Sequence, residues 1–175
     1  MASIILVGFM GSGKTTIGKQ LAHYLQMPHL DLDAWIESEI GQSIASIFAD
    51  QGESFFRDLE SQALSAAIHR EGILSTGGGT PARLANRKLL TASSCPVIFL
   101  HTSPDVIRAR LNDDGSRPLL QDLNQEKFNQ LFHERDGYYR SCADLTILTD
   151  NKTPDEIMLE ILEQHTYLKK QFGLL

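Results

Sequence analysis

The chain has 175 residues, of which 42% are apolar and 22% are charged, and its formal net charge is −6. A chain of this length can bury about 70% of its unfolded surface, so we expect one domain over residues 1–175 that needs no disulfide. The acidic balance argues against a nucleic-acid-binding surface, which should be basic. Cys95 and Cys142 lie far apart in the sequence and indicate neither a disulfide framework nor a zinc site.

No apolar stretch approaches the ~20 residues that a membrane-spanning helix needs, and the first residues lack the pattern of a signal peptide. We therefore expect a cytoplasmic protein without membrane contact. The sequence shows no long exposed apolar repeat, which favours a monomer.

The segment 8–15, GFMGSGKT, fits the phosphate-binding pattern G-x-x-x-x-G-K-[ST] without a mismatch. The apolar run 4–7 before it predicts a buried strand, and apolar residues at every fourth position after it predict an amphipathic helix over 15–26. Glycines remove the β-carbons that would hold backbone N–H groups away from phosphate oxygens. We expect Lys14 to reach the β- and γ-phosphates of a nucleotide and the Thr15 hydroxyl to bind Mg²⁺.

A short strand over 28–33 ends in two acidic residues, Asp31 and Asp33. On an extended chain, residues two apart point to the same side. Ligands gather at the carboxyl ends of parallel strands, so one carboxylate could approach a metal and the other a substrate. The alternative is that Asp33 caps a helix that begins at Ala34, and the residues alone do not separate the two interpretations.

Short helices are expected over 34–40 and 44–50, followed by a longer one over 53–70. Arg57 and Glu60 are three residues apart on the longer helix and can pair, although an exposed pair would contribute little to stability. The residues alone leave a ligand-binding role and a surface ion pair equally open.

A third strand over 73–76 runs into three consecutive glycines, Gly77, Gly78 and Gly79. Three glycines in a row cost backbone entropy. At the carboxyl end of a strand, they favour backbone N–H groups that meet a ligand over a simple tight turn.

A polar segment at about 112–122 carries Arg117 and follows a helix that begins at Pro104. We expect this segment to be mobile, with Arg117 on a lid that closes over the phosphates. The alternative is a solvated loop arginine. The remaining expected elements are a helix over 84–92, a strand over 96–100, a helix over 125–139, a strand over 145–148 and a final helix from Thr153. Strands that alternate with helices in this way predict a three-layer α/β/α fold with a five-stranded parallel sheet.

ATPases and GTPases usually place an apolar strand that ends in Asp after the phosphate loop, and neither the strand over 73–76 nor that over 96–100 does so. The segment 151–154, NKTP, begins like the guanine-reading N-K-x-D, but Pro154 stands where Asp is required. A small chain with an acid pair and an arginine in a mobile segment indicates instead a kinase of small molecules.

The sequence closely resembles the shikimate kinases over nearly the whole chain. Six motifs follow that family's order: GFMGSGKTT at 8–16, DLD at 31–33, FFRDLE at 55–60, STGGG at 75–79, RPLL at 117–120, and ER at 134–135 followed by YY at 138–139. The resemblance implies a P-loop kinase of the nucleoside monophosphate kinase-like fold. It also implies transfer of the γ-phosphoryl group of ATP, with Mg²⁺, to the 3-hydroxyl of shikimate, in the pathway to chorismate and aromatic amino acids. Gluconate kinases share the loop and the sheet but not the full set of motifs. A gluconate kinase and a non-catalytic nucleotide-binding homologue remain the alternatives.

The resemblance also implies roles for individual residues. Shikimate is expected to contact Asp33, Arg57, Gly78, Gly79 and Arg135, with Glu60 holding Arg57 in position and Phe48 and Phe56 as either pocket wall or ordinary core. Asp33 is expected to accept the proton of the 3-hydroxyl, while Lys14 and Arg117 neutralise the charge on the transferring group. The residues expected to bind ATP are Gly11, Ser12, Gly13, Lys14, Thr15, Thr16, Arg110, Arg117 and Lys152, with Arg110 stacked on adenine and Lys152 also at the base. Thr15 and Asp31 are expected at the metal, Asp31 through water.

Overall fold

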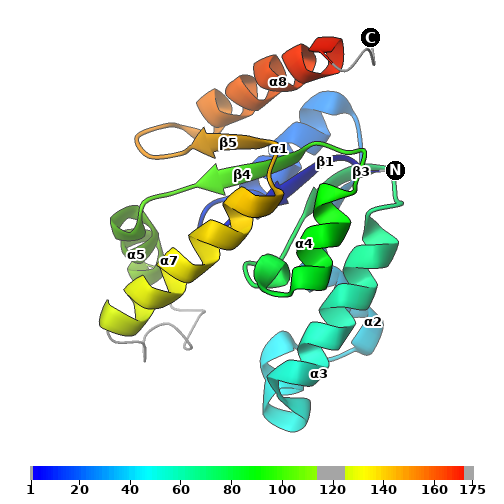
Figure 1. The fold of residues 1–175 in the computed structure, drawn as a ribbon, viewed down its shortest axis with the longest axis vertical. Coiled ribbons are helices and arrows are strands. Elements are labelled where there is room, and N and C mark those ends of the chain that lie inside the picture. The colour runs from blue at the N-terminus through cyan, green and yellow to red at the C-terminus, as the bar shows by residue number, and fades with distance from the viewer. Residues whose placement is uncertain (1, 114–124, 172–175) are drawn as a thin grey trace.

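The computed structural model describes residues 2–113 and 125–171 (Figure 1). Within these residues, five parallel strands form one sheet in the order β2-β3-β1-β4-β5. The strands are β1 (Ala2–Val7), β2 (His29–Asp31), β3 (Gly72–Ser75), β4 (Val97–His101) and β5 (Leu145–Leu148). Because β1 lies in the centre, the loop that follows it starts from the middle of the sheet.

Helices cover both faces of this sheet. They are α1 (Lys14–Leu25), α2 (Leu32–Ile40), α3 (Ile44–Ala67), α4 (Leu84–Thr91), α5 (Pro104–Asp113), α7 (Gln125–Cys142) and α8 (Pro154–Gln171), with a short 3-10 turn η1 (Thr80–Ala82). In Figure 1, α1 and α8 lie on one face, α4 and α7 lie on the other, and the first part of α3 lies well away from the sheet. The predicted three-layer α/β/α fold with five parallel strands is confirmed.

Successive residues of β1 serve two separate cores. Ile4 and Leu6 pack with side chains of α1 and α8, whereas Ile5 and Val7 pack with side chains of α3 and α7. Consecutive side chains of a strand point to opposite faces, so a strand that is covered on both faces needs an unbroken apolar run. This pattern fixes β1 between two layers of helices.

The carboxyl ends of β2, β3 and β1 lie level with one another. Asp31 of β2 pairs with Ser75 of β3, and Ser75 pairs with Leu6 of β1. The loop after β1, the start of α2 and the glycine loop, residues 77–79, therefore leave the sheet side by side.

The second strand is shorter than predicted, and this changes the geometry of its two acidic residues. It ends at Asp31, whose side chain accepts a hydrogen bond from the Ala34 N–H at 3.2 Å and so caps α2. Asp33 lies in the first turn of α2 and neither caps the helix nor sits on extended chain. The prediction that Asp33 lies on extended chain and the alternative that it caps the helix were therefore both wrong. The helix begins two residues earlier than expected, at Leu32, so Asp31 became the cap.

The two helices predicted on either side of Gly52 form one element, α3, with a kink at this glycine. Gly52 has φ 83° and ψ 170°, a backbone conformation that glycine adopts without strain. The helix resumes at once, so Glu53 begins its second segment. The predicted boundary is therefore correct in position, but no loop separates the two helical parts.

The predicted lid falls mostly outside the described residues. Asn112 and Asp113 are the last residues of α5, while Arg117 belongs to the range 114–124 that the structure does not describe. Among the helices of the described part, none has the length and apolar character needed to cross a membrane.

Candidate active site

The loop over 8–15 connects the central strand to α1. A Cβ atom at Gly8 would lie 2.7 Å from the carbonyl oxygen of Leu100 on β4, so a larger residue does not fit there. Gly13, the residue before α1, has φ 97°, which glycine tolerates at no steric cost. The first N–H groups of a helix have no partner within the helix, so the loop and α1 together offer donors to an anion.

The Lys14 side chain lies across its own loop. Its Nζ donates hydrogen bonds to the carbonyl oxygens of Gly8 at 2.8 Å and Phe9 at 2.9 Å, and the residue is only 8% exposed. The ammonium group is thus held at the loop, where it can exchange these bonds for bonds to phosphate oxygens.

Thr15 and Asp31 meet at the level ends of the strands. The Thr15 hydroxyl donates to Asp31 Oδ2 at 2.7 Å, while Asp31 Oδ1 caps α2. A hydroxyl and a carboxylate are hard oxygen donors of the kind that Mg²⁺ takes alongside phosphate oxygens and water. No cluster of three or more His, Cys, Asp or Glu side chains suited to a metal occurs in the described ranges, so any such ion would depend on those additional oxygens.

A cavity of about 1240 Å³ opens at this edge of the sheet. Its lining includes predicted site residues from distant parts of the chain: Gly11, Ser12, Gly13, Lys14, Thr15, Thr16, Asp31, Asp33, Gly78, Arg110 and Lys152. The fold therefore brings the residues predicted for the phosphates, the metal and the adenine base together with Asp33, which was predicted to contact the substrate.

The glycine loop fits between the acidic residues and the phosphate loop. A Cβ atom at Gly77 would lie 2.6 Å from Asp33 Oδ1 and 2.9 Å from Glu60 Oε1. A Cβ atom at Gly78 would lie 3.0 Å from the backbone nitrogen of Met10. The glycines therefore permit a close approach of neighbouring groups, and the predicted contact of their N–H groups with a ligand stays a prediction.

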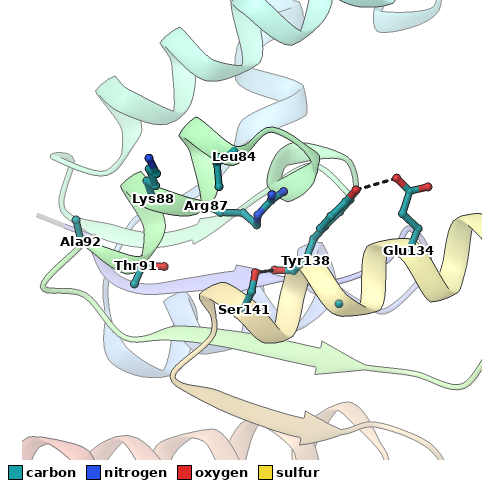
Figure 2. A pocket seen from close by; sticks show the side chains of 9 residues that line it. Leu84, Arg87, Lys88, Thr91, Ala92, Glu134, Tyr138 and Ser141 are labelled. Carbon is teal, nitrogen blue, oxygen red and sulfur yellow. Dashed lines mark hydrogen bonds between the residues drawn. The ribbon is translucent and has the colours of Figure 1, made fainter.

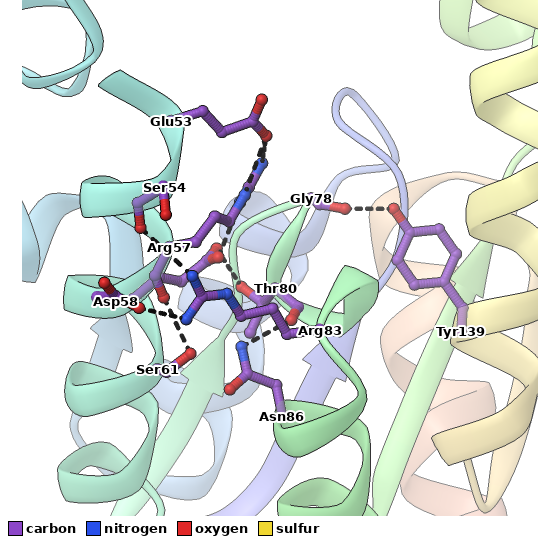
Figure 3. A network of polar contacts seen from close by, with 11 residues as sticks. Glu53, Ser54, Arg57, Asp58, Ser61, Gly78, Thr80, Arg83, Asn86 and Tyr139 are labelled. Carbon is purple, nitrogen blue, oxygen red and sulfur yellow. Dashed lines mark hydrogen bonds and ion pairs between the residues drawn. The ribbon is translucent and has the colours of Figure 1, made fainter. Parts of the chain in front are cut away.

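Arg57 lies against the glycine loop and makes two ion pairs on α3 (Figure 3). Nη1 donates to Glu60 at 2.7 Å and Nη2 donates to Glu53 at 3.1 Å, while the guanidinium carbon lies 5.4 Å from the centre of the Phe56 ring. The side chains of Arg57 and Glu60 are 13% and 1% exposed, so this is no surface pair. Burial acts to lower the pKa of Arg57, but Glu60 and Glu53 outweigh it and the pKa is raised above its ordinary value. The guanidinium stays charged.

Two residues that the sequence analysis did not single out support the buried carboxylate of Glu60. The Thr80 hydroxyl donates to Glu60 Oε1 at 2.7 Å, and Asn86 Nδ2 donates to the carbonyl oxygen of Thr80 at 2.9 Å (Figure 3). Thr80 and Asn86 are 0% and 2% exposed. Both oxygens of Glu60 thus have a donor, as a buried charge requires.

Arg135 and Tyr139 approach the glycine loop from α7. The Tyr139 hydroxyl donates to the carbonyl oxygen of Gly78 at 2.5 Å (Figure 3). Burial raises the pKa of Tyr139, although the charge of Arg135 acts to lower it, so the hydroxyl keeps its proton. The Arg135 guanidinium carbon lies 5.6 Å from the centre of the Phe9 ring, and its Nε is buried without a hydrogen-bond partner among the described residues. Arg57 therefore lies against Gly79, while Arg135 lies near Phe9 and Tyr139, and neither arginine lines the large cavity.

The two residues predicted at adenine line the large cavity and have partners of their own. Arg110 Nη1 donates to the carbonyl oxygen of Gly11 at 3.1 Å, and Lys152 Nζ donates to Glu160 at 2.5 Å. Their contacts with a base stay predictions. Arg117, the predicted lid residue, lies outside the described residues.

Phe48 and Phe56 pack on each other with ring centroids 4.9 Å apart. Phe56 is 3% exposed and belongs to the core, and Phe48 packs against that core. These contacts favour the core interpretation, although the Arg57 guanidinium also lies over the Phe56 ring.

A second groove, of about 690 Å³, lies between α4 and α7 (Figure 2). In it the guanidinium of Arg87 lies 4.3 Å from the centre of the Tyr138 ring, and the Tyr138 hydroxyl donates to Glu134 at 2.8 Å. None of its lining residues was predicted for the site. The predicted site residues that line a cavity therefore gather in the larger one and not in this groove.

Comparison with known proteins agrees with this geometry. A family model described as shikimate kinase matches residues 10–166. A shikimate kinase of Enterococcus faecalis is 44% identical over 166 residues, which cover 94% of this chain and 98% of that protein. A solved shikimate kinase from Acinetobacter baumannii, in complex with shikimate, has a TM-score of 0.88 at 37% identity over 95% of this chain and 93% of that one.

A solved gluconokinase from Sinorhizobium meliloti has a TM-score of 0.61 at 16% identity, and the match covers 99% of this chain and 96% of that one. At this identity the likeness shows the fold alone. The family model and the relatives that are more than one third identical over nearly the full length decide the matter: the chain belongs to the shikimate kinase family, ATP-dependent phosphotransferases that act on shikimate in the pathway to aromatic amino acids.

Proposed function

We propose that Asp33 orients the 3-hydroxyl of shikimate and accepts its proton while the γ-phosphoryl group arrives from ATP. The observation that carries this role is that the carboxylates of Asp33 and Glu60 both face Gly77, and Glu60 is the partner of Arg57. Asp33 also lines the cavity that contains the phosphate loop. Asp33 thus lies near both Arg57, which is suited to bind a carboxylate, and the phosphate loop. A base that takes a proton from a hydroxy acid during phosphoryl transfer needs such a position.

The carboxylate of shikimate is proposed to bind Arg57 and Arg135, with the backbone of Gly78 and Gly79 beside it. A guanidinium group offers paired N–H donors that match the two oxygens of a carboxylate. The buried Nε of Arg135, which has no hydrogen-bond partner among the described residues, supports this assignment because an anion would satisfy it. In this proposal the hydroxyl side of the substrate faces Asp33.

ATP is proposed to bind through the backbone N–H groups of residues 11–16, with Lys14 exchanging its carbonyl partners for phosphate oxygens. Arg110 and Lys152 are assigned to the base side of the cavity, and Arg117 to the transferring phosphoryl group. In the reaction the bond from the 3-oxygen to the γ-phosphorus forms, the bond to the β,γ-bridging oxygen breaks, and ADP leaves. Because such transition states are loose, positioning and positive charge contribute more than deprotonation.

Thr15 and Asp31 are the residues proposed to hold Mg²⁺, Asp31 through water. Their oxygens lie 2.7 Å apart, and both are donors of the hard type that this ion prefers. When bound, Mg²⁺ neutralises charge on the β- and γ-phosphates.

We also propose that the enzyme acts as a monomer. The exposed large apolar side chains of the described part are spread over separate elements, as Tyr24 on α1, Leu84 on α4 and Leu159 on α8 illustrate. A dimer interface needs such side chains to gather in one place. Sedimentation at working concentrations gives the mass directly, and a species of about twice the 19.5 kDa chain mass would contradict the proposal.

The test of the function is ADP release from Mg-ATP, measured with shikimate, gluconate and nucleoside monophosphates at equal concentration. Stimulation by shikimate alone is expected. Stimulation by gluconate and not by shikimate would favour the alternative of a gluconate kinase and contradict the proposed acceptor. ATP binding without turnover on any acceptor would favour a non-catalytic homologue.

A further inference from the structure

The guanidinium group of Arg57 has two edges that can hold a carboxylate with paired N–H groups. The end edge, formed by Nη1 and Nη2, faces Gly79, where a Cβ atom would collide with both nitrogens, and Glu60 takes Nη1 at 2.7 Å. The side edge, formed by Nε and Nη2, is held by a single oxygen of Glu53 at 3.3 Å and 3.1 Å. A substrate carboxylate can therefore gain a paired contact only on the side edge.

We propose that Glu53 is an internal competitor for the substrate carboxylate. Its own carboxylate occupies the side edge of Arg57 and leaves when the acid group of shikimate binds. This inference rests on the proposed role of Arg57 in binding that acid group. Glu53 thus sets the affinity of the site for its acceptor without touching the reacting atoms.

The two carboxylates around Arg57 differ in their ability to leave. Glu60 is 1% exposed, and its second oxygen accepts from Thr80, so its release would bury an unpaired charge. Glu53 is 66% exposed and can be solvated as soon as it swings away. Figure 3 shows it at the outer end of the network, above Arg57.

The kink in α3 also lowers the free-energy cost of releasing the Glu53 carboxylate from Arg57. Gly52 interrupts the helical backbone at φ 83°, so Glu53 lies in the first turn of the second segment. An acidic side chain is favoured near the positive end of a helix. The carboxylate that leaves Arg57 therefore keeps a favourable position at the start of this segment.

Competition of this kind acts on acids and not on their neutral analogues. A ligand with an ester in place of the carboxylate cannot offer the charge needed to displace Glu53, so it binds to a site where Arg57 stays paired. Exposed ion pairs of this type change equilibria by about two- to fivefold. The presence of Glu53 should weaken shikimate binding by that factor.

The experiment is calorimetric titration of the full-length chain with shikimate and with shikimate methyl ester at fixed ionic strength. Glu53→Gln is expected to lower the Kd for shikimate about two- to fivefold and to leave the Kd for the ester unchanged. Glu53→Ala, which removes the whole competing group, should do the same. An unchanged or higher Kd for shikimate in both variants would overturn the inference.

Asp58→Asn is the matched control. Asp58 lies on the same helix, is 59% exposed and pairs with Arg83 on a different side of the network (Figure 3). It removes the same charge as Glu53→Gln without touching Arg57. If Asp58→Asn tightens shikimate binding equally, the effect is one of net charge and the competitor role fails.

Arg57→Lys separates this inference from the proposed function. If this change leaves the Kd for shikimate unaltered, the proposed role of Arg57 fails, and the competitor role fails with it. If Arg57→Lys weakens binding while Glu53→Gln does not tighten it, only the competitor role fails. In the double variant that combines Arg57→Lys with Glu53→Gln, the tighter shikimate binding caused by Glu53→Gln should disappear. Lysine has no paired N–H edge for which the two carboxylates could compete.

Discussion

The phosphate loop leaves the central strand of the sheet, whereas the proposed acceptor side of the site is carried by α3, α7 and the glycine loop. In the phosphate loop, Gly8 packs on a strand carbonyl and Lys14 is held by two backbone carbonyls. On the acceptor side, Arg57 is held by the side chains of Glu53 and Glu60, one exposed and one buried. The proposed phosphate site thus rests on backbone that the core fixes, whereas the proposed acceptor site rests on side-chain pairs that can exchange.

The largest effect should come from the group between the two regions. Asp33→Asn is expected to lower kcat at least ~10²-fold, the loss typical of a missing general base. The Kd for ATP should stay unchanged, because the loop backbone and Lys14, rather than this carboxylate, are proposed to bind the phosphates. Steady-state kinetics and nucleotide titration measure the two quantities, and wild-type turnover in the variant would remove Asp33 from the mechanism.

A change on the acceptor side alone should separate the two regions. Arg57→Lys keeps the charge but loses the paired donors, and charge-assisted hydrogen bonds contribute about 1.5–3 kcal/mol. We expect the KM for shikimate to rise about tenfold or more while the KM for ATP stays the same. An equal rise in both constants would show that the acceptor side also shapes the phosphate loop.

Tyr139→Phe tests how firmly α7 holds the glycine loop. The variant leaves the carbonyl oxygen of Gly78 without the hydroxyl that now donates to it at 2.5 Å. We expect the free energy of unfolding to fall by about 1–3 kcal/mol and the KM for shikimate to rise severalfold. Urea unfolding and kinetics give both values. A loss of stability without any change in the KM for shikimate would make Tyr139 purely structural.

The smallest expected effect concerns pH and lies on the phosphate side. His29 Nε2 lies 2.9 Å from the Ser75 hydroxyl, which donates to the carbonyl oxygen of Lys14 at 3.0 Å. Burial lowers the pKa of His29 below its ordinary value of 6.5. Below this value the unfolded chain binds more protons than the folded one, so stability falls with decreasing pH until the lower, folded-state pKa is passed.

His29→Asn should therefore flatten the dependence of Tm on pH between neutral and mildly acidic conditions. His23→Asn is the control, since His23 is exposed on α1. Thermal unfolding at several pH values measures both. Identical slopes in wild type and His29→Asn would show that this histidine does not contribute to acid sensitivity.

The sequence predicted what is encoded in neighbouring residues. The loop over 8–15 is one continuous pattern, and the apolar run 4–7 could only be a strand covered on both faces, as the two cores confirm. The pairing of Arg57 with Glu60 followed from helical spacing. The four-residue spacing of Glu53 and Arg57 carries the same kind of signal, although the glycine before Glu53 suggests a helix end there.

Other features depend on contacts between distant segments. Thr80 donates to Glu60 over 20 positions in the chain, and Tyr139 reaches Gly78 over 61 positions. No local pattern encodes such contacts. The error at Asp33 has a local cause: two aspartates at alternate positions compete for one cap, and the winner depends on where the sheet pairing of β2 ends.

The hydrogen bonds of Lys14 have a consequence for the energetics of nucleotide exchange. Because its ammonium group already bridges two carbonyl oxygens of the loop, a nucleotide meets a loop whose shape was fixed when the protein folded. If Lys14 binds the phosphates as proposed, nucleotide binding exchanges the hydrogen-bond partners of one cation and orders little backbone, which keeps the entropic cost of binding small. In that proposal ADP, which lacks the γ-phosphate, leaves Lys14 free to donate again to the carbonyl oxygens of Gly8 and Phe9, and this exchange favours release of the product.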